Sequence, residues 1–151
     1  MPAPNLKEYL KDNRVPYKSI EHSPAYTAQE VAASAHISGQ DVAKVVMVKV
    51  DGVMKLVVIP ANDKVNFNRL KQSFHADLVE LASEEEFSRM FPECEAGAQP
   101  PFGNLYGLEV YVSENLTRDR EIAFNACSHW ELIRMSYQDF ERLAHPHVIQ
   151  A

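Results

Sequence analysis

One lysine stands at the beginning of an apolar strand, where a charged side chain needs an explanation. Lys44 follows Ala43 in the stretch AKVVMVKVDGVMKLVVIPAN, residues 43–62. An ammonium group that a rigid strand holds at the rim of a pocket can bind a phosphate or polarise a carbonyl. The alternative is a solvated lysine at a strand end, and position alone favours that alternative. Lys49 and Lys55 alternate with apolar residues and are predicted to lie on an exposed strand face.

A second candidate is the segment GAQPPFGNLYG, residues 97–107, whose three glycines and two prolines predict a loop. Glycine permits unusual backbone angles and proline fixes them, so such a loop can direct N–H groups into a pocket. Oxyanion holes and anion-binding nests are built in this way. Gly97, Pro101, Phe102 and Gly103 are therefore candidate site residues. A rigid surface turn is the alternative, and it is favoured when the loop is considered alone.

The histidines and cysteines show no recognisable metal-binding or nucleophile motif. His129 follows a predicted strand in FNACSHWELIRM and is either a pocket residue or a hydrogen-bonded structural histidine. His145 and His147 are interpreted as part of a frayed tail. Cys94 and Cys127 are too few for a disulfide framework and are interpreted as packing residues. No metal and no cofactor is expected.

The elements that must position these residues are short. Apolar spacing and N-terminal capping residues predict helices over residues 5–14 and from Thr27, Asn66, Ser83 and Ser136. Alternating apolar residues predict strands at 46–50, 56–59, 108–112, 121–126 and 130–135. Asp51-Gly52 predicts a tight hairpin turn. Because strands and helices mix without a βαβ rhythm, we expect an α+β fold. Its sheet should be mixed, largely antiparallel and partly barrel-like, with helices around it.

Length, composition and charge bound the classes of protein that remain. The 151 residues suit one domain over residues 1–151, and 46% apolar with 24% charged residues is ordinary for a globular protein. No apolar run is long enough to span a membrane and no secretory signal is present, so we expect a cytoplasmic location. The net charge of −6 argues against a protein that grips long stretches of nucleic acid. It leaves open a local pocket for one nucleotide end.

Several motifs follow one another along nearly the whole chain, from about residue 5 to residue 144. They are His22-Ser-Pro24, Thr27, Ala43-Lys44-Val45-Val46, Leu56 to Pro60, Gly97-x-x-x-Pro101-Phe102-Gly103 and Ser136-Tyr-Gln-Asp139-Phe. In order and spacing this series resembles the YbaK/ProX family of aminoacyl-tRNA deacylases. That family is similar to the editing (insertion) domain of bacterial prolyl-tRNA synthetases.

The resemblance implies hydrolysis of the ester that joins a wrong amino acid to the 3′ end of tRNA. Lys44 would hold the terminal nucleotide or the substrate backbone, and residues 97–101 would place backbone groups beside the scissile ester. The ribose hydroxyl of the tRNA would help to activate water, without a metal or a cysteine or serine nucleophile. Such enzymes are needed because one methylene group changes binding in an apolar pocket by only about 1–3 kcal/mol.

The resemblance leaves the residue that senses the amino acid open, and Asn125 and His129 compete for that role. His22, Tyr26 and Thr27 are candidates for the rim of the pocket. Since the chain carries no synthetase domain, we expect a free-standing trans-editing factor. Its partner would be the 3′ end of aminoacyl-tRNA, with a synthetase as a further candidate and no membrane. The alternatives are a non-catalytic module that binds a nucleotide, a tRNA end or a protein in the same pocket, and a hydrolase of small esters.

Overall fold

The structure is a computed structural model, and it describes residues 6–22 and 38–151. Its helices are α1 (Leu6–Asp12), α3 (Phe67–Phe74), α4 (Glu84–Ser88), α5 (Tyr137–Ala144) and the 3₁₀ helix η1 (Gly103–Tyr106). Its strands are β1 (Tyr17–Glu21), β2 (Ala43–Val50), β3 (Val53–Pro60), β4 (Val79–Leu81), β5 (Val110–Ser113), β6 (Glu121–Asn125), β7 (Glu131–Ser136) and β8 (His147–Ile149). Tyr26, Thr27 and the helix expected from Thr27 lie outside the described residues.

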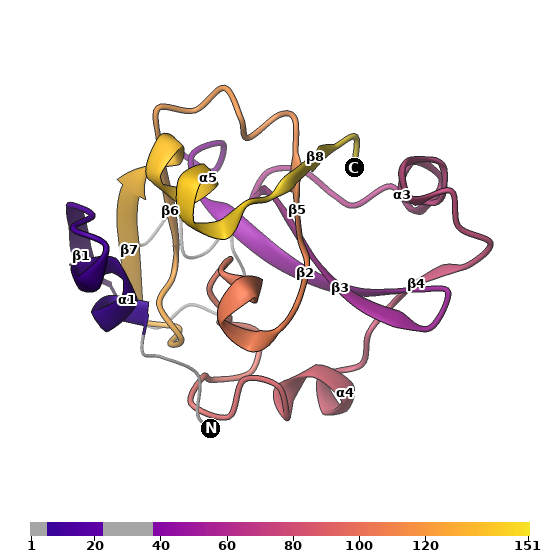
Figure 1. The fold of residues 1–151 in the computed structure, drawn as a ribbon, viewed down its shortest axis with the longest axis horizontal. Coiled ribbons are helices and arrows are strands. Elements are labelled where there is room, and N and C mark those ends of the chain that lie inside the picture. Colours follow the sequence, from indigo (N-terminus) through magenta and orange to yellow (C-terminus); the bar gives the residue numbers. More distant parts are fainter. Residues whose placement is uncertain (1–5, 23–37) are drawn as a thin grey trace.

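The strands form two sheets, one of three strands in the order β1-β7-β6 and one of five in the order β4-β2-β3-β5-β8. Figure 1 shows the three-stranded sheet at the left and the five-stranded sheet in the centre and right. An isolated bridge between Val42 and Ala123 connects them. The β3–β5 and β5–β8 ladders are parallel and the others are antiparallel. The predicted α+β class and largely antiparallel mixed sheet are confirmed, but the described strands close no barrel.

Local turn and cap signals form as the sequence predicts. Asp51 and Gly52 adopt φ of 49° and 85°, so the hairpin between β2 and β3 turns at the expected pair. Asn66 and Ser136 accept backbone N–H bonds at the starts of α3 and α5, and Ser83 forms a capping box at the start of α4. These signals act within a few residues, so tertiary context does not override them.

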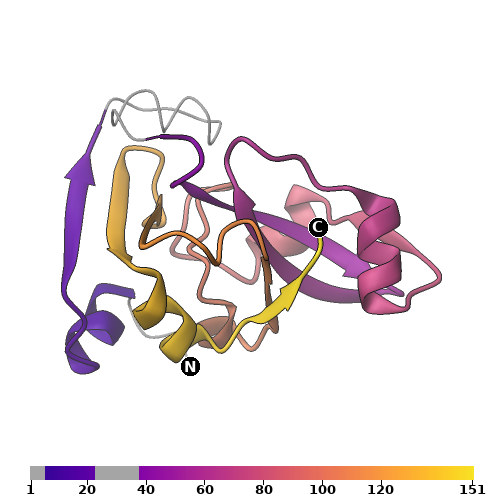
Figure 2. The ribbon, with the colours of Figure 1, turned by 90° about the horizontal axis from the view of Figure 1, so that it is seen from above.

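The two faces of the five-stranded sheet cover two separate cores. One core lies between the sheets and under α5, and the other lies under α3. In Figure 2 α3 lies at one end of the molecule and α1 at the other. Side chains alternate along a strand. On β2, therefore, Val45 and Met47 face the first core, whereas Val46 and Val48 face α3. Lys44 has the same parity as Val46 and lies on the α3 side.

Two expectations about charged and C-terminal segments are wrong. Lys49 and Lys55 do not share an exposed face, because the β2–β3 register pairs Lys55 with Val48, the neighbour of Lys49, and so puts the two lysines on opposite faces of the sheet. Both are partly buried, and they form ion pairs with Glu86 and Glu109 at 2.8 and 2.9 Å. The predicted frayed tail is β8, which lies parallel to β5 and places the ring of His147 beside Tyr111. The open edge of β5 supplies the backbone partners that no local sequence signal reveals. In the part of the chain that the structure describes, no helix is long and apolar enough to cross a bilayer.

The predicted loop over residues 97–107 is partly helical, since η1 occupies its second half. Phe102, which precedes η1, is fully buried in the first core. Its ring packs edge-on against Tyr9, Phe124 and Phe140, with centroid distances of 6.1, 5.7 and 5.5 Å. Phe102 thus anchors the loop to the first core.

We predict that Phe102→Ala lowers the free energy of unfolding by about 3–5 kcal/mol, because it leaves a cavity among three aromatic rings. Urea unfolding followed by circular dichroism measures the effect. Leu78→Ala, at a side chain that is 55% exposed, serves as the control and should change stability by less than about 1 kcal/mol. Equal losses in both variants would contradict the anchoring role of Phe102.

Candidate functional site

The loop that begins at Gly97 packs against the turn between β6 and β7. Two backbone hydrogen bonds join them: the Glu95 N–H donates to the Cys127 carbonyl at 2.9 Å, and the Cys127 N–H donates to the Ala98 carbonyl at 3.0 Å. Gly97 has a φ of +82°, a value that side chains other than glycine rarely tolerate. The backbone path of residues 95–98 is therefore fixed by its neighbours as well as by its own sequence.

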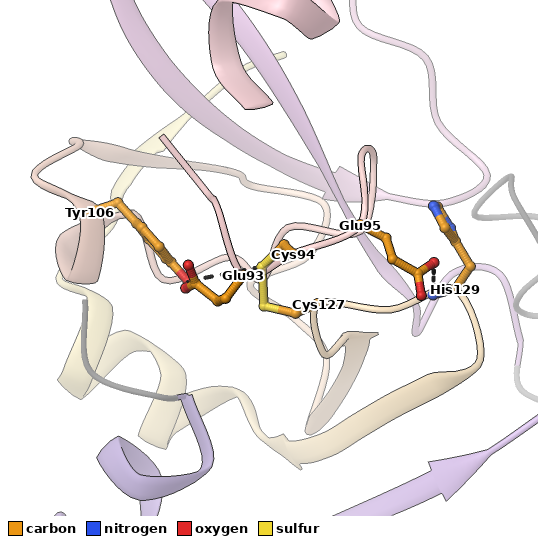
Figure 3. The surroundings of a disulfide bond; sticks show 6 residues. All are labelled: Glu93, Cys94, Glu95, Tyr106, Cys127 and His129. Carbon is orange, nitrogen blue, oxygen red and sulfur yellow. Dashed lines mark hydrogen bonds between the residues drawn. A yellow bond between two sulfur atoms is a disulfide. The ribbon is translucent and has the colours of Figure 1, made fainter. Parts of the chain in front are cut away.

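His129 braces this loop from the other side of the turn. The side chain is 7% exposed, and its Nε2–H donates to the Ala96 carbonyl at 2.7 Å. The His129 backbone N–H donates to the Glu95 carboxylate at 3.3 Å, as Figure 3 shows. A Cβ atom at Gly97 would lie 3.6 Å from Cε1 of the His129 ring. His129 thus lies directly beside Gly97 and binds Ala96 and Glu95, the two residues that precede it.

A disulfide between Cys94 and Cys127 lies where the same two segments meet (Figure 3). The interpretation of these cysteines as separate packing residues is wrong. They are 33 residues apart in sequence, so only the tertiary fold brings them together and their spacing carries no signal. One ligand atom each from Glu93, Cys94 and Cys127 lies within 4.8 Å of the others, although the two sulfur atoms are bonded to one another here.

Glu93 and Tyr106 extend this cluster toward η1. The Tyr106 hydroxyl donates to the Glu93 carboxylate. Burial, and then the hydrogen bond to Glu93, raise the pKa of Tyr106 far above its usual range. The hydroxyl therefore stays protonated and keeps the segment before Cys94 attached to η1.

Asn125 and Ser128 place polar oxygens in the buried part of this region. Ile122 and Phe124 on β6 face the first core, so Asn125 faces the opposite side of the three-stranded sheet, paired with Leu132. Asn125 Oδ1 and Ser128 Oγ are buried and make no hydrogen bond within residues 6–22 and 38–151. Buried polar atoms normally have partners, so each unpartnered atom calls for a ligand or a functional explanation. Nothing local in the sequence predicts the burial of Ser128, so sequence reasoning misses it.

Lys44 lines a separate cavity of about 230 Å³ on the α3 side of β2. Burial lowers the pKa of its ammonium group, Asp63 opposes this shift, and the charge of Lys64 adds to it. Among residues 6–22 and 38–151, no carboxylate forms an ion pair with Lys44. Lys44 is therefore a partly desolvated cation with room for an anion.

The predicted site residues thus fall into three groups. Gly97 and His129 lie side by side, and the His22 N–H donates to the Trp130 carbonyl at 2.9 Å, which brings His22 to the same turn. Pro101, Phe102 and Gly103 are buried. Gly103 packs tightly against Leu108. A Cβ atom at position 103 would lie 3.1 Å from the carbonyl oxygen of Leu108. The described lining of the Lys44 cavity includes no residue of the Gly97 loop.

We predict that reducing the disulfide lowers the free energy of unfolding by about 3–4 kcal/mol, the chain-entropy value for a ring of this size. Urea unfolding with and without dithiothreitol measures the change. The double variant Cys94→Ser/Cys127→Ser is the control, because its stability should not respond to the reductant. A wild-type protein that is equally stable in both conditions would contradict the stabilising role of the bond.

Comparisons with known proteins agree on one family. The sequence model of the aminoacyl-tRNA editing domain matches residues 22–143. A proline–tRNA ligase of Geobacillus sp. (strain WCH70) is 31% identical over 118 residues, which are 76% of this chain and 19% of the ligase. The ligase of Bacillus mycoides (strain KBAB4) is 31% identical over 111 residues, 72% of this chain and 19% of the ligase. The chain thus spans about a fifth of the length of these relatives.

Solved structures support the same fold. The crystal structure of hypothetical protein APE2540 superposes with a TM-score of 0.85 at 19% identity, covering 97% of this chain and 98% of that one. A candidate trans-editing enzyme for prolyl tRNA synthetase superposes with a TM-score of 0.81 at 16% identity, covering 98% and 94%. The family match over residues 22–143 and the ligase relatives show that this chain belongs to the aminoacyl-tRNA editing domain family, which also forms the insertion domain of prolyl-tRNA synthetases.

Proposed function

We propose that this chain is a trans-editing deacylase that hydrolyses the ester of mischarged aminoacyl-tRNA. The observation that carries the proposal is the braced loop at Gly97. Hydrogen bonds with His129 and Cys127 fix its backbone. Asn125, two residues before Cys127, has a buried side-chain oxygen that makes no hydrogen bond with the described residues. A rigid backbone wall and an unpartnered polar atom in the adjoining turn are suited to hold a polar substrate in one orientation. Membership of the editing family supplies the substrate class.

In this proposal water adds to the carbonyl carbon of the ester. The bond from that carbon to the ribose oxygen then breaks, and the ribose oxygen leaves with a proton. Backbone N–H groups of the Gly97 loop would stabilise the oxyanion of the tetrahedral intermediate, a role for which fixed donors are effective. A ribose hydroxyl of the tRNA would orient the water. Lys44 would hold the terminal nucleotide through its phosphate, a charged hydrogen bond of about 1.5–3 kcal/mol.

We base different proposed roles for Asn125 and His129 on their hydrogen bonds. The His129 Nε2–H is already bound to the Ala96 carbonyl, so this side chain is a positioning residue for the loop. Asn125 Oδ1 has no such bond with the described residues and could accept one from the amino group or side chain of a substrate. We therefore assign the sensing of the amino acid to Asn125.

A module that binds a tRNA end without hydrolysis is the second candidate, and one observation favours it. The cavity at Lys44 and the Gly97 loop share no residue in the described lining, so the cation can hold a nucleotide without the loop. Such a module would bind mischarged tRNA and leave its ester intact.

We predict that the wild-type protein releases alanine, serine or cysteine from tRNA for proline, and that Lys44→Ala slows release at least tenfold by loss of the phosphate contact. Lys71→Ala removes an exposed lysine from α3 and is the matched control. Acid-gel separation of charged and uncharged tRNA follows the reaction, and circular dichroism checks the fold. If the Lys44→Ala variant released the amino acid at the wild-type rate, the proposed phosphate contact of Lys44 would be contradicted. Binding without release by the wild type would favour the non-catalytic module.

The two assignments near the loop predict different kinetic signatures. Asn125→Ala should change the ratio of release rates among the amino acids, because it alters what the pocket recognises. His129→Ala should lower all rates by a similar factor, because it loosens the loop that every substrate uses. Measuring kcat/KM for each mischarged tRNA separates the two patterns, and an exchange of these patterns would overturn both assignments.

A further inference from the structure

The cavity beside Lys44 has a second cation and an apolar floor that the proposed contact to the terminal nucleotide does not explain. Lys44 and Lys64 line it together with Val46, Val65, Phe67 and Leu81. Its volume of about 230 Å³ lies below the roughly 300–1,000 Å³ of pockets that enclose a whole drug-sized ligand. The cavity therefore suits one part of a longer ligand that continues past it.

No carboxylate of the described residues binds directly to either lysine of this cavity. In the described part of the chain neither Lys44 nor Lys64 forms an ion pair, whereas Lys49 and Lys55 both do. The charge of Asp63 acts on Lys44 without a salt bridge between them, and Asp63 Oδ2 accepts a hydrogen bond from Asn115 at 3.0 Å. A protein of net charge −6 thus keeps two neighbouring cations without a carboxylate bound to either. Such a pair attracts a phosphate.

The floor of the cavity offers an aromatic ring next to these cations. Phe67 is the first residue of α3, and Asn66 fixes its position by capping the helix. The ring is partly buried against the core under α3 and remains accessible in the cavity. Leu81 is 60% exposed at the same cavity. A cation beside an accessible aromatic ring is the combination that binds the phosphate and base of a single-stranded nucleotide.

We propose that this cavity is a subsite for the nucleotide that precedes the aminoacylated one at the 3′ end of tRNA. Lys44 and Lys64 together hold the phosphate that links these two nucleotides, and the base of the preceding nucleotide stacks on Phe67. This inference rests on the proposed function and extends it, since it identifies a second nucleotide as part of the recognised substrate. It assigns new roles to Lys64 and Phe67.

The test uses a labelled RNA hairpin that ends in single-stranded CCA and a second hairpin whose last linkage is a neutral methylphosphonate. Fluorescence anisotropy gives the dissociation constant of each hairpin with the 151-residue chain. We expect the wild type to bind the neutral hairpin about tenfold more weakly. In Lys64→Gln this difference should shrink several-fold, because the variant has lost one partner of that phosphate. Phe67→Leu keeps an apolar side chain, and should weaken binding of both hairpins about fivefold.

Lys71→Gln, which removes the same charge from the exposed surface of α3, should bind both hairpins as the wild type does. The proposal is overturned if Lys64→Gln retains the wild-type difference, if Lys71→Gln and Lys64→Gln lose affinity equally, or if the wild type binds neither hairpin. Because binding is measured with uncharged RNA, the result does not depend on hydrolysis. Failure of the wild type to release any amino acid would instead overturn the proposed function, whatever the binding comparison shows.

Discussion

The bracing of the Gly97 loop by the β6–β7 turn is the constraint on which the candidate site depends. Glycine at position 97 permits the positive φ of the loop but does not by itself stabilise that backbone conformation. That conformation is stabilised by the hydrogen bond from the His129 ring to the Ala96 carbonyl, by two backbone hydrogen bonds with Cys127 and by the Cys94–Cys127 disulfide. Phe102 then fixes the far end of the loop in the aromatic core. A catalytic wall made of backbone groups needs this support, because fixed donors act only if they do not reorganise during the reaction.

The five-stranded sheet separates the two halves of the proposed binding surface. Phe102 packs in the first core on one face, while the cavity with Lys44 and Lys64 lies on the α3 side of β2. In the proposal both contacts fall on the terminal nucleotide, whose 5′ phosphate lies at the lysines and whose ester lies at the loop. Its ribose would therefore lie between the two parts of the binding surface. The net charge of −6 disfavours non-specific binding of the protein to the phosphates of the tRNA body.

How much the sequence predicts depends on how local the cause is. The Asp51-Gly52 turn and the caps at Asn66, Ser83 and Ser136 form within a few residues, and all four are as predicted. The motif order also indicates the family that the comparisons show. The Cys94–Cys127 bond, strand β8 and the burial of Phe102 arise from contacts between distant segments. Periodicity and spacing do not predict contacts of this kind. The roles of His129 and Ser128 can therefore be inferred only from the structure, in which the loop packs against their turn.

A stable substrate analogue bound to the protein tests the central claim most directly. In a 3′-aminoacylamino RNA ending in CCA, an amide replaces the ester and cannot be released. A crystal structure of this complex should place the amide carbonyl within hydrogen-bonding distance of backbone N–H groups in residues 97–101, with Lys44 on the terminal phosphate. An analogue whose aminoacyl group lies away from the Gly97 loop would contradict the account, even if the RNA end were bound at Lys44.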